Sequence, residues 1–174
     1  MLTFDARITL RLTTKGGRSM SDEWIETSVK QIKEADKERR RRDELEMHRA
    51  DKLGAHGGAM WKALVKSLKA TAEKFNANFP YEGTKHLTFE DERSDSIAVV
   101  SGRDVSMRLS MDSELHSINY DVWDGNNKKV NEGTVPLGFT KDWEVCFIVE
   151  SRPVSTEKLT QLLLDQLIKF YLES

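Results

Sequence analysis

At 174 residues the chain is long enough for one globular domain with an extension, and no run approaches the roughly 18–20 apolar residues of a membrane span. Charged residues make up 32% of the sequence and apolar ones only 38%, so we expect a modest core and strongly solvated segments. The 27 basic and 29 acidic side chains leave a net charge of -2, which by itself indicates neither a nucleic-acid-binding protein nor an acidic tail.

The two halves of the chain differ in charge. Residues 1–80 carry 17 Lys and Arg against 12 Asp and Glu, a net of +5, whereas residues 81–174 carry 10 against 17, a net of -7. Such a split can steer a partner or orient self-association, although two solvated surfaces that merely differ would give the same counts.

Residues 1–20 are expected to form a flexible or loosely ordered extension. Apolar and polar side chains alternate from Phe4 to Thr13, which is the period of a strand, and a glycine-containing connection follows at Lys15–Ser19. An added strand is the second interpretation and a targeting segment the third, and Met20 is an alternative natural start.

Residues 21–80 are predicted to be helical, with a hinge near 54–58. The first segment begins with an apolar stripe formed by Trp24, Ile25, Val29 and Ile32. Residues 33–52 are then nearly all charged, and attractive pairs at helical spacing, such as Glu38–Arg42, support a helix without much burial. Gly54, Gly57 and Gly58 each disfavour a helix by about 1 kcal/mol relative to Ala, which predicts a hinge or a tight corner there.

The second helical segment has a clear buried face that ends before Pro80. Its apolar residues recur at helical spacing, at Trp61, Leu64, Val65, Leu68, Ala72 and Phe75. Most of its lysines lie off this stripe, which is typical of a helix packed on its apolar face with the lysines in water.

Residues 81–174 are predicted to form an antiparallel sheet and a C-terminal helix that make one domain with the second helical segment. The alternation of apolar and polar residues changes to a period of two after residue 85, and short turn sequences such as Asp124–Asn127 separate the runs. The predicted strands are Leu87–Phe89, Ile97–Val100, Val105–Met111, His116–Val122, a weaker one near 128–135 and Trp143–Glu150. The last run is apolar on both faces, which indicates an interior strand.

The C-terminal helix begins after the predicted cap Ser155 and has two apolar stripes. Leu159, Leu162, Leu163, Leu167 and Phe170 form one, and Leu164, Ile168 and Leu172 form the other. One sheet face cannot bury so wide a surface alone, so either the helix at 59–75 covers the remainder or the second stripe is a candidate interface with a protein partner or a second copy. The fold class is therefore α+β: long N-terminal helical segments, a five- or six-stranded antiparallel meander, and a C-terminal helix packed on the sheet.

No motif for catalysis, a metal or a cofactor is recognisable. The four histidines have no metal-ligand spacing, and the single cysteine, Cys146, is interpreted as a buried, unreactive thiol. His116 and Tyr120 fall on one face of a predicted strand and are candidate lining residues of a pocket between sheet and helices, although a hydrogen-bonded core histidine is the favoured interpretation of His116.

A basic run is the remaining candidate for a binding site. Arg39, Arg40, Arg41, Arg42, Lys62, Lys66 and Lys69 are the candidate nucleic-acid contacts. The four arginines radiate around a helix and are bracketed by acids, which favours a solvated helix surface instead.

We therefore expect a small, cytoplasmic, non-enzymatic interaction module without a cofactor, which forms a homo-oligomer through apolar helix surfaces or binds another protein. A nucleic-acid-associated accessory protein and a small-ligand-binding or enzymatic pocket are the two alternatives.

Overall fold

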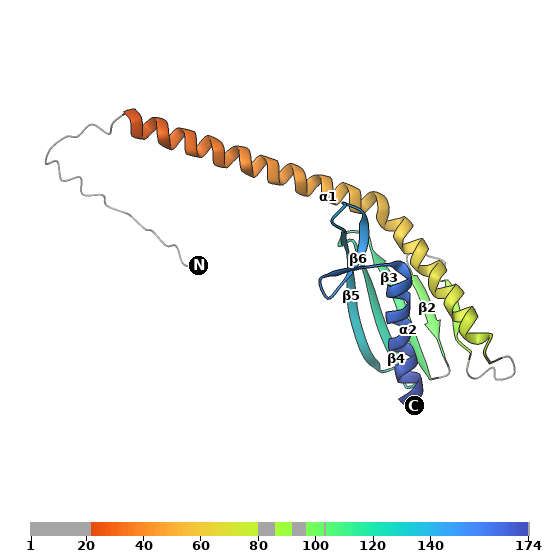
Figure 1. Ribbon diagram of the computed structural model, residues 1–174. Coiled ribbons are helices and arrows are strands. Elements are labelled where there is room, and N and C mark those ends of the chain that lie inside the picture. The colour runs from red at the N-terminus through yellow and green to blue at the C-terminus, as the bar shows by residue number, and fades with distance from the viewer. Residues whose placement is uncertain (1–21, 80–85, 92–96, 103, 174) are drawn as a thin grey trace, which may run out of the picture. The chain divides into compact units, whose positions relative to one another are not determined.

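The computed structural model describes residues 22–79, 86–91, 97–102 and 104–173 and confirms the α+β class (Figure 1). The elements in chain order are α1 (Asp22–Asn76), β1 (Thr88–Asp91), β2 (Ile97–Ser101), β3 (Val105–Asp112), β4 (Ser117–Asp124), β5 (Lys129–Phe139), β6 (Val145–Val149), β7 (Arg152–Val154) and α2 (Thr156–Glu173). The extension expected at 1–20 lies outside the described residues. Among the described residues, no helix combines the length and the apolar character needed to cross a membrane.

The chain divides into two compact units, Met1–Glu46 and Met47–Ser174. The boundary falls within α1, so the first unit contributes residues 22–46 of that helix and the second contributes the rest of it. The second unit also holds the whole sheet and α2.

The sheet is a simple meander in which each strand pairs antiparallel with the next one along the chain. The predicted back-and-forth arrangement is confirmed, but the described part of the chain contributes seven strands to the sheet instead of the expected five or six. The short β7 was not expected, and β5 is longer than the predicted strand near 128–135 because it continues through Pro136 and Gly138. Pro136 is tolerated since β5 pairs with β6 only from Leu137 to Phe139, so its missing N–H lies outside that ladder.

One face of this sheet makes the core together with two helices. Residues of adjacent strands such as Met107, Val122 and Val100 are directly paired, point to the same face and are fully buried. They belong to one hydrophobic cluster with Leu64 and Leu68 of α1 and with Leu159, Leu163 and Leu167 of α2. The predicted core stripes of the second helical segment and of the C-terminal helix are therefore buried on the same sheet face.

Helix α1 runs without a break through its three glycines, which corrects the predicted hinge near 54–58. Gly57 is buried, and a Cβ there would lie 2.8 Å from the Met111 Cε and 3.6 Å from the Leu137 Cδ1. The glycine lets the helix approach the sheet closely, and the packing that this allows offsets the low helix propensity of glycine. Local sequence alone could not show this compensation.

Helix α2 starts at the predicted cap. The backbone N–H of Lys158 donates to the Ser155 Oγ at 3.2 Å, and the N–H of Leu159 donates to the Ser155 carbonyl at 2.9 Å. Hydrogen bonds from its own backbone N–H and from the Ser155 hydroxyl lower the pKa of Glu157, as expected for an acid in the first turn.

Trp143 lies before β6 and not inside it, which corrects the predicted strand Trp143–Glu150. Its φ of 63° places it in the turn between β5 and β6, and 39% of the residue is exposed. The Arg49 guanidinium lies 5.1 Å from the centre of its ring, and the Lys52 Nζ donates to its carbonyl oxygen. These contacts join the turn to α1 within the second unit.

The glycines of α1 predict a paired mutational test. Gly57→Leu should destabilise the protein by about 1–3 kcal/mol, because its Cβ would already lie 2.8 Å from the Met111 Cε and the rest of the new side chain has to displace neighbours at this buried position. Gly58→Ala should instead stabilise it by about 0.5–1 kcal/mol, since nothing lies within 4 Å of a Cβ at that position. Urea denaturation measures both, and equal effects at the two sites would refute the close-approach explanation.

Candidate functional site

Residues 22–46 of α1 carry an exposed apolar stripe. Ile25, Val29 and Ile32 are spaced by four and three residues, which puts them on one face of the helix. Their exposed fractions are 45%, 43% and 61%, and Trp24 beside them is 56% exposed. We call Ile25, Val29 and Ile32 the α1 stripe. The sequence revealed the stripe but not its exposure, because apolar spacing looks the same on a buried helix.

Beyond Ile32 the same helix face becomes charged. Continuing the spacing leads to Asp36, Arg39, Asp43 and Glu46. Arg39 and Asp36 form an ion pair of 2.7 Å, and both side chains are at least half exposed. Such a pair contributes little to stability in water, so this part of the helix face is solvated and the stripe ends at Ile32.

The predicted nucleic-acid contacts are divided between the two compact units. Arg39 and Arg42 face Asp36 and Glu38 at 2.7 Å and 4.0 Å, whereas Arg40 and Arg41 have no such ion pair among the described residues. Arg40 and Arg41 line a shallow depression of about 530 Å³ with Lys33 and Lys37, and Asp36 and Glu44 complete it. The exposed residues Lys62, Lys66 and Lys69 belong to the other compact unit.

The second stripe of α2 is not the free surface that its pattern predicted. Leu164 is only 4% exposed and belongs to the hydrophobic core, which corrects its place in the candidate interface. Ile168 is half-buried, and the side chain of Leu172 lies outside the described residues. Leu164 is buried because α1 lies beside α2 on the sheet, where the Thr160 Oγ1 donates to the Ser67 Oγ at 2.9 Å.

A groove of about 410 Å³ remains between the two helices in the second unit. Its apolar lining includes Phe75, Leu87 and Ile168, and Lys74 and Asp165 are among its charged residues. Its volume is at the lower end of the range of small-molecule sites. Its polar lining comes from both helices, with Thr71 and Lys74 of α1 and Glu157 and Gln161 of α2.

Tyr120 lines a depression over β4 and β5 that does not include His116. His116 precedes β4 and has a φ of 48°. Its ring lies near Gly54 of α1, because a Cβ added to that glycine would be 3.7 Å from the His116 Cε1. Tyr120 lies against Gly133 of β5, so closely that a Cβ on Gly133 would overlap the Tyr120 ring. The expected pairing on one strand face fails because β4 begins only at Ser117.

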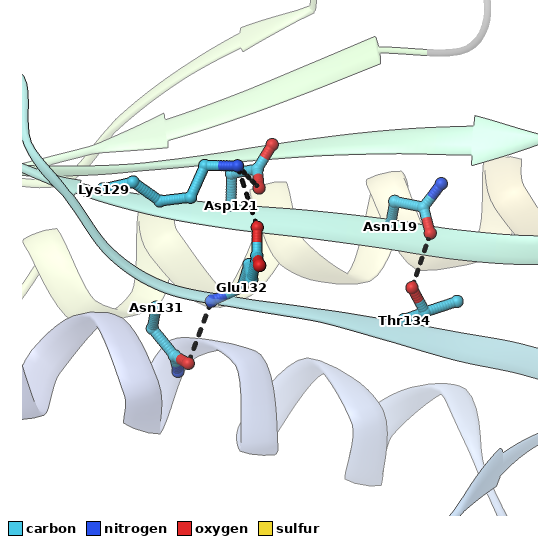
Figure 2. A network of polar contacts seen from close by, with 6 residues as sticks. All are labelled: Asn119, Asp121, Lys129, Asn131, Glu132 and Thr134. Carbon is cyan, nitrogen blue, oxygen red and sulfur yellow. Dashed lines mark hydrogen bonds and ion pairs between the residues drawn. The ribbon is translucent and has the colours of Figure 1, made fainter.

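The opposite face of the sheet carries a polar network (Figure 2). Asp121 of β4 and Glu132 of β5 are directly paired, and like charges at such positions repel. Lys129 bridges them, with its Nζ 2.8 Å from the Asp121 Oδ1 and 2.9 Å from the Glu132 Oε2. The hydrogen bonds to Asp121 and then to Glu132 raise the pKa of Lys129 above its ordinary value of 10.5.

A β-bulge places Lys129 in this network. The pairing of β4 and β5 shifts between Val122 and Trp123, so that Val122 faces Asn131 and Trp123 faces Lys129, with Val130 as the extra residue. The Lys129 Nζ also lies 5.5 Å from the centre of the Trp123 ring. Sequence reasoning missed this cluster because the bulge has no signature in the local alternation.

On the same face the Thr134 Oγ1 donates to the Asn119 Oδ1 at 2.8 Å, and the backbone N–H of Glu132 donates to the Asn131 Oδ1 at 2.9 Å (Figure 2). On the side of α2, the Asn131 amide donates to the Gln166 Oε1 at 3.2 Å. The depression over these strands has a volume of about 330 Å³. The charged groups are already paired with one another, so the network is best explained as reinforcement of the β4–β5 pair.

The described residues contain no group of three or more His, Cys, Asp or Glu side chains that could hold a metal ion. Cys146 is buried, and burial raises the pKa of its thiol. Less of it is therefore a thiolate at neutral pH than for an exposed cysteine.

No protein-family model matches this chain, and neither a curated protein nor a solved structure matches it significantly. The assignment of a function therefore depends on the surfaces described above.

The Lys129 bridge predicts a stability effect with a defined pH range. Lys129→Met should lower the urea midpoint, since it leaves Asp121 and Glu132 facing each other, whereas Lys128→Met next to it should not. Because the folded pKa of Lys129 is raised, its contribution is fully present at neutral pH and is lost only as the pH rises above 10.5. Equal midpoints for both variants at pH 7 would rule out the bridge.

Proposed function

We propose that this protein is a non-enzymatic interaction module that self-associates through the α1 stripe. The supporting observation is the exposure of three aliphatic side chains in a row on a helix whose other faces are charged. Aliphatic side chains at helical spacing are the usual contact of one amphipathic helix with another. A second copy supplies an identical stripe and so matches it in length and spacing.

The stripe is small, which sets the expected strength of the association. Burying the exposed half of one such side chain contributes about 1 kcal/mol, so the three side chains of each copy contribute about 6 kcal/mol together. The loss of translational and rotational freedom costs about 4–15 kcal/mol. Even at the lowest cost only about 2 kcal/mol remains, so we expect a weak, concentration-dependent equilibrium with a dissociation constant of tens of millimolar from the stripe alone.

A charge in the stripe should abolish this equilibrium. Ile32→Glu would place two carboxylates in the contact, one from each copy, and should weaken association at least about tenfold because burying a charge is costly. Leu45→Glu is the matched control, since Leu45 is also an exposed aliphatic residue of α1, at 41%, but lies off the stripe. Sedimentation equilibrium from about 0.1 mM to 5 mM, where a dimer this weak begins to be populated, gives both constants. A wild-type protein that stays monomeric throughout this range disproves self-association.

A second candidate function is the binding of a nucleic acid by the basic depression of residues 22–46. The observation that favours it is that Lys33, Lys37, Arg40 and Arg41 gather around one depression, with both arginines outside the described ion pairs. Cations that are not already paired are the ones that can release counterions from a phosphate backbone. Asp36 and Glu44 in the same depression limit the expected affinity.

This second candidate predicts a difference between two arginine pairs. Binding to single-stranded DNA should weaken steeply with salt, and Arg40→Ala with Arg41→Ala should reduce the slope of log K against log salt by about 1.4. Arg39→Ala with Arg42→Ala should change it less, since these two already face acids. Fluorescence anisotropy measures the slopes. The absence of binding at about 50 mM salt removes this candidate.

A further inference from the structure

We infer that two copies pair antiparallel across the α1 stripe, with Val29 of one copy opposite Ile32 of the other. This inference rests on the proposed self-association and adds the direction and the register of the pair. It follows from the charges that continue the stripe along the same helix face.

A parallel pair in register is disfavoured by like charges. In such a pair each residue of the face meets its own copy, so Asp36, Arg39, Asp43 and Glu46 would each oppose an identical charge. The three apolar layers of the stripe would be followed by four repulsive ones. Like charges that face each other at a contact repel, so they select against the parallel orientation.

An antiparallel pair avoids these layers. With Val29 of one copy opposite Ile32 of the other, the residue numbers of facing positions add up to about 61. The two-fold axis then passes between residues 30 and 31 of each copy. Ile25 then faces Asp36, whose carboxylate is already paired with Arg39 of its own helix at 2.7 Å. Asp43 and Glu46 have no facing position within residues 22–46 of the other copy, so they remain in water.

The flanking charges favour the same register. Glu26 and Lys33 lie on the same edge of the stripe, and in an antiparallel pair the Glu26 of one copy is nearest to the Lys33 of the other. The two-fold axis creates this attraction twice. Moving the register by one heptad would bring Glu26 nearest to Glu26 of the other copy in one direction and Lys33 nearest to Lys33 in the other, and both pairs are repulsive.

The direction can be measured with spin labels. In a Cys146→Ser background, single labels at Gln31→Cys and Leu45→Cys report the distance between copies, and both positions lie off the stripe. At 1.5 Å per residue, the antiparallel register separates the two Gln31 positions by about 2 Å along the axis and the two Leu45 positions by about 44 Å. We expect a short distance at residue 31 and one above about 40 Å at residue 45. Short distances at both positions overturn the antiparallel pair.

A charge exchange tests the register independently. Glu26→Lys alone and Lys33→Glu alone should each weaken association about three- to tenfold, and the double exchange should restore it. In a parallel pair the double variant would gain nothing, since neither residue faces the other. Failure of the exchange while Ile32→Glu still abolishes association overturns this register alone. A protein that never associates instead overturns the proposed function, so the two failures are distinguishable.

Discussion

The burial of one sheet face by two helices is the constraint on which the rest of this structure depends. Leu64 and Leu68 of α1 and Leu167 of α2 are less than 2% exposed, and all three belong to the same cluster as the sheet residues. Seven strands make a face too wide for one helix, so α1 and α2 have to share it. The buried Leu164 and the continuous helix through Gly57 are both consequences of this arrangement.

Helix α1 meets two different physical environments along its length. In the second unit its apolar residues are buried and contribute to the core. Within residues 22–46 its apolar side chains are exposed, and its charged side chains form local ion pairs. Local pairs contribute only a few tenths of a kcal/mol each, so the propensity of Lys, Arg, Glu and Ala supports this part of the helix. An apolar stripe in such a segment adds nothing to the core, and this is why we connect it with a partner.

On the sheet face opposite the core, polar residues bind one another instead of forming a ligand site. On the face opposite the core, cross-strand partners such as Asn119 and Thr134 satisfy each other, and Lys129 satisfies two carboxylates at once. A group that is already paired loses those contacts when it binds a ligand. The α1 stripe differs from this network, because burying its aliphatic groups sacrifices no hydrogen bond.

The sequence by itself determined the α+β class, the meander and the core stripes, since these depend on alternation, helical spacing and turn residues that act locally. Only the tertiary structure decided the outcome at Gly57, Leu164, His116 and Lys129. At Gly57 the helix packs close to Met111, and Leu164 is buried in the core formed with a neighbouring helix. His116 lies before its strand with a positive φ, and a bulge in β5 places Lys129 opposite Trp123. Each depends on a neighbour distant in sequence or on a shift of register, neither of which a local pattern contains. The exposure of Ile25, Val29 and Ile32 was likewise decided by the fold, because the same spacing is found on buried helices.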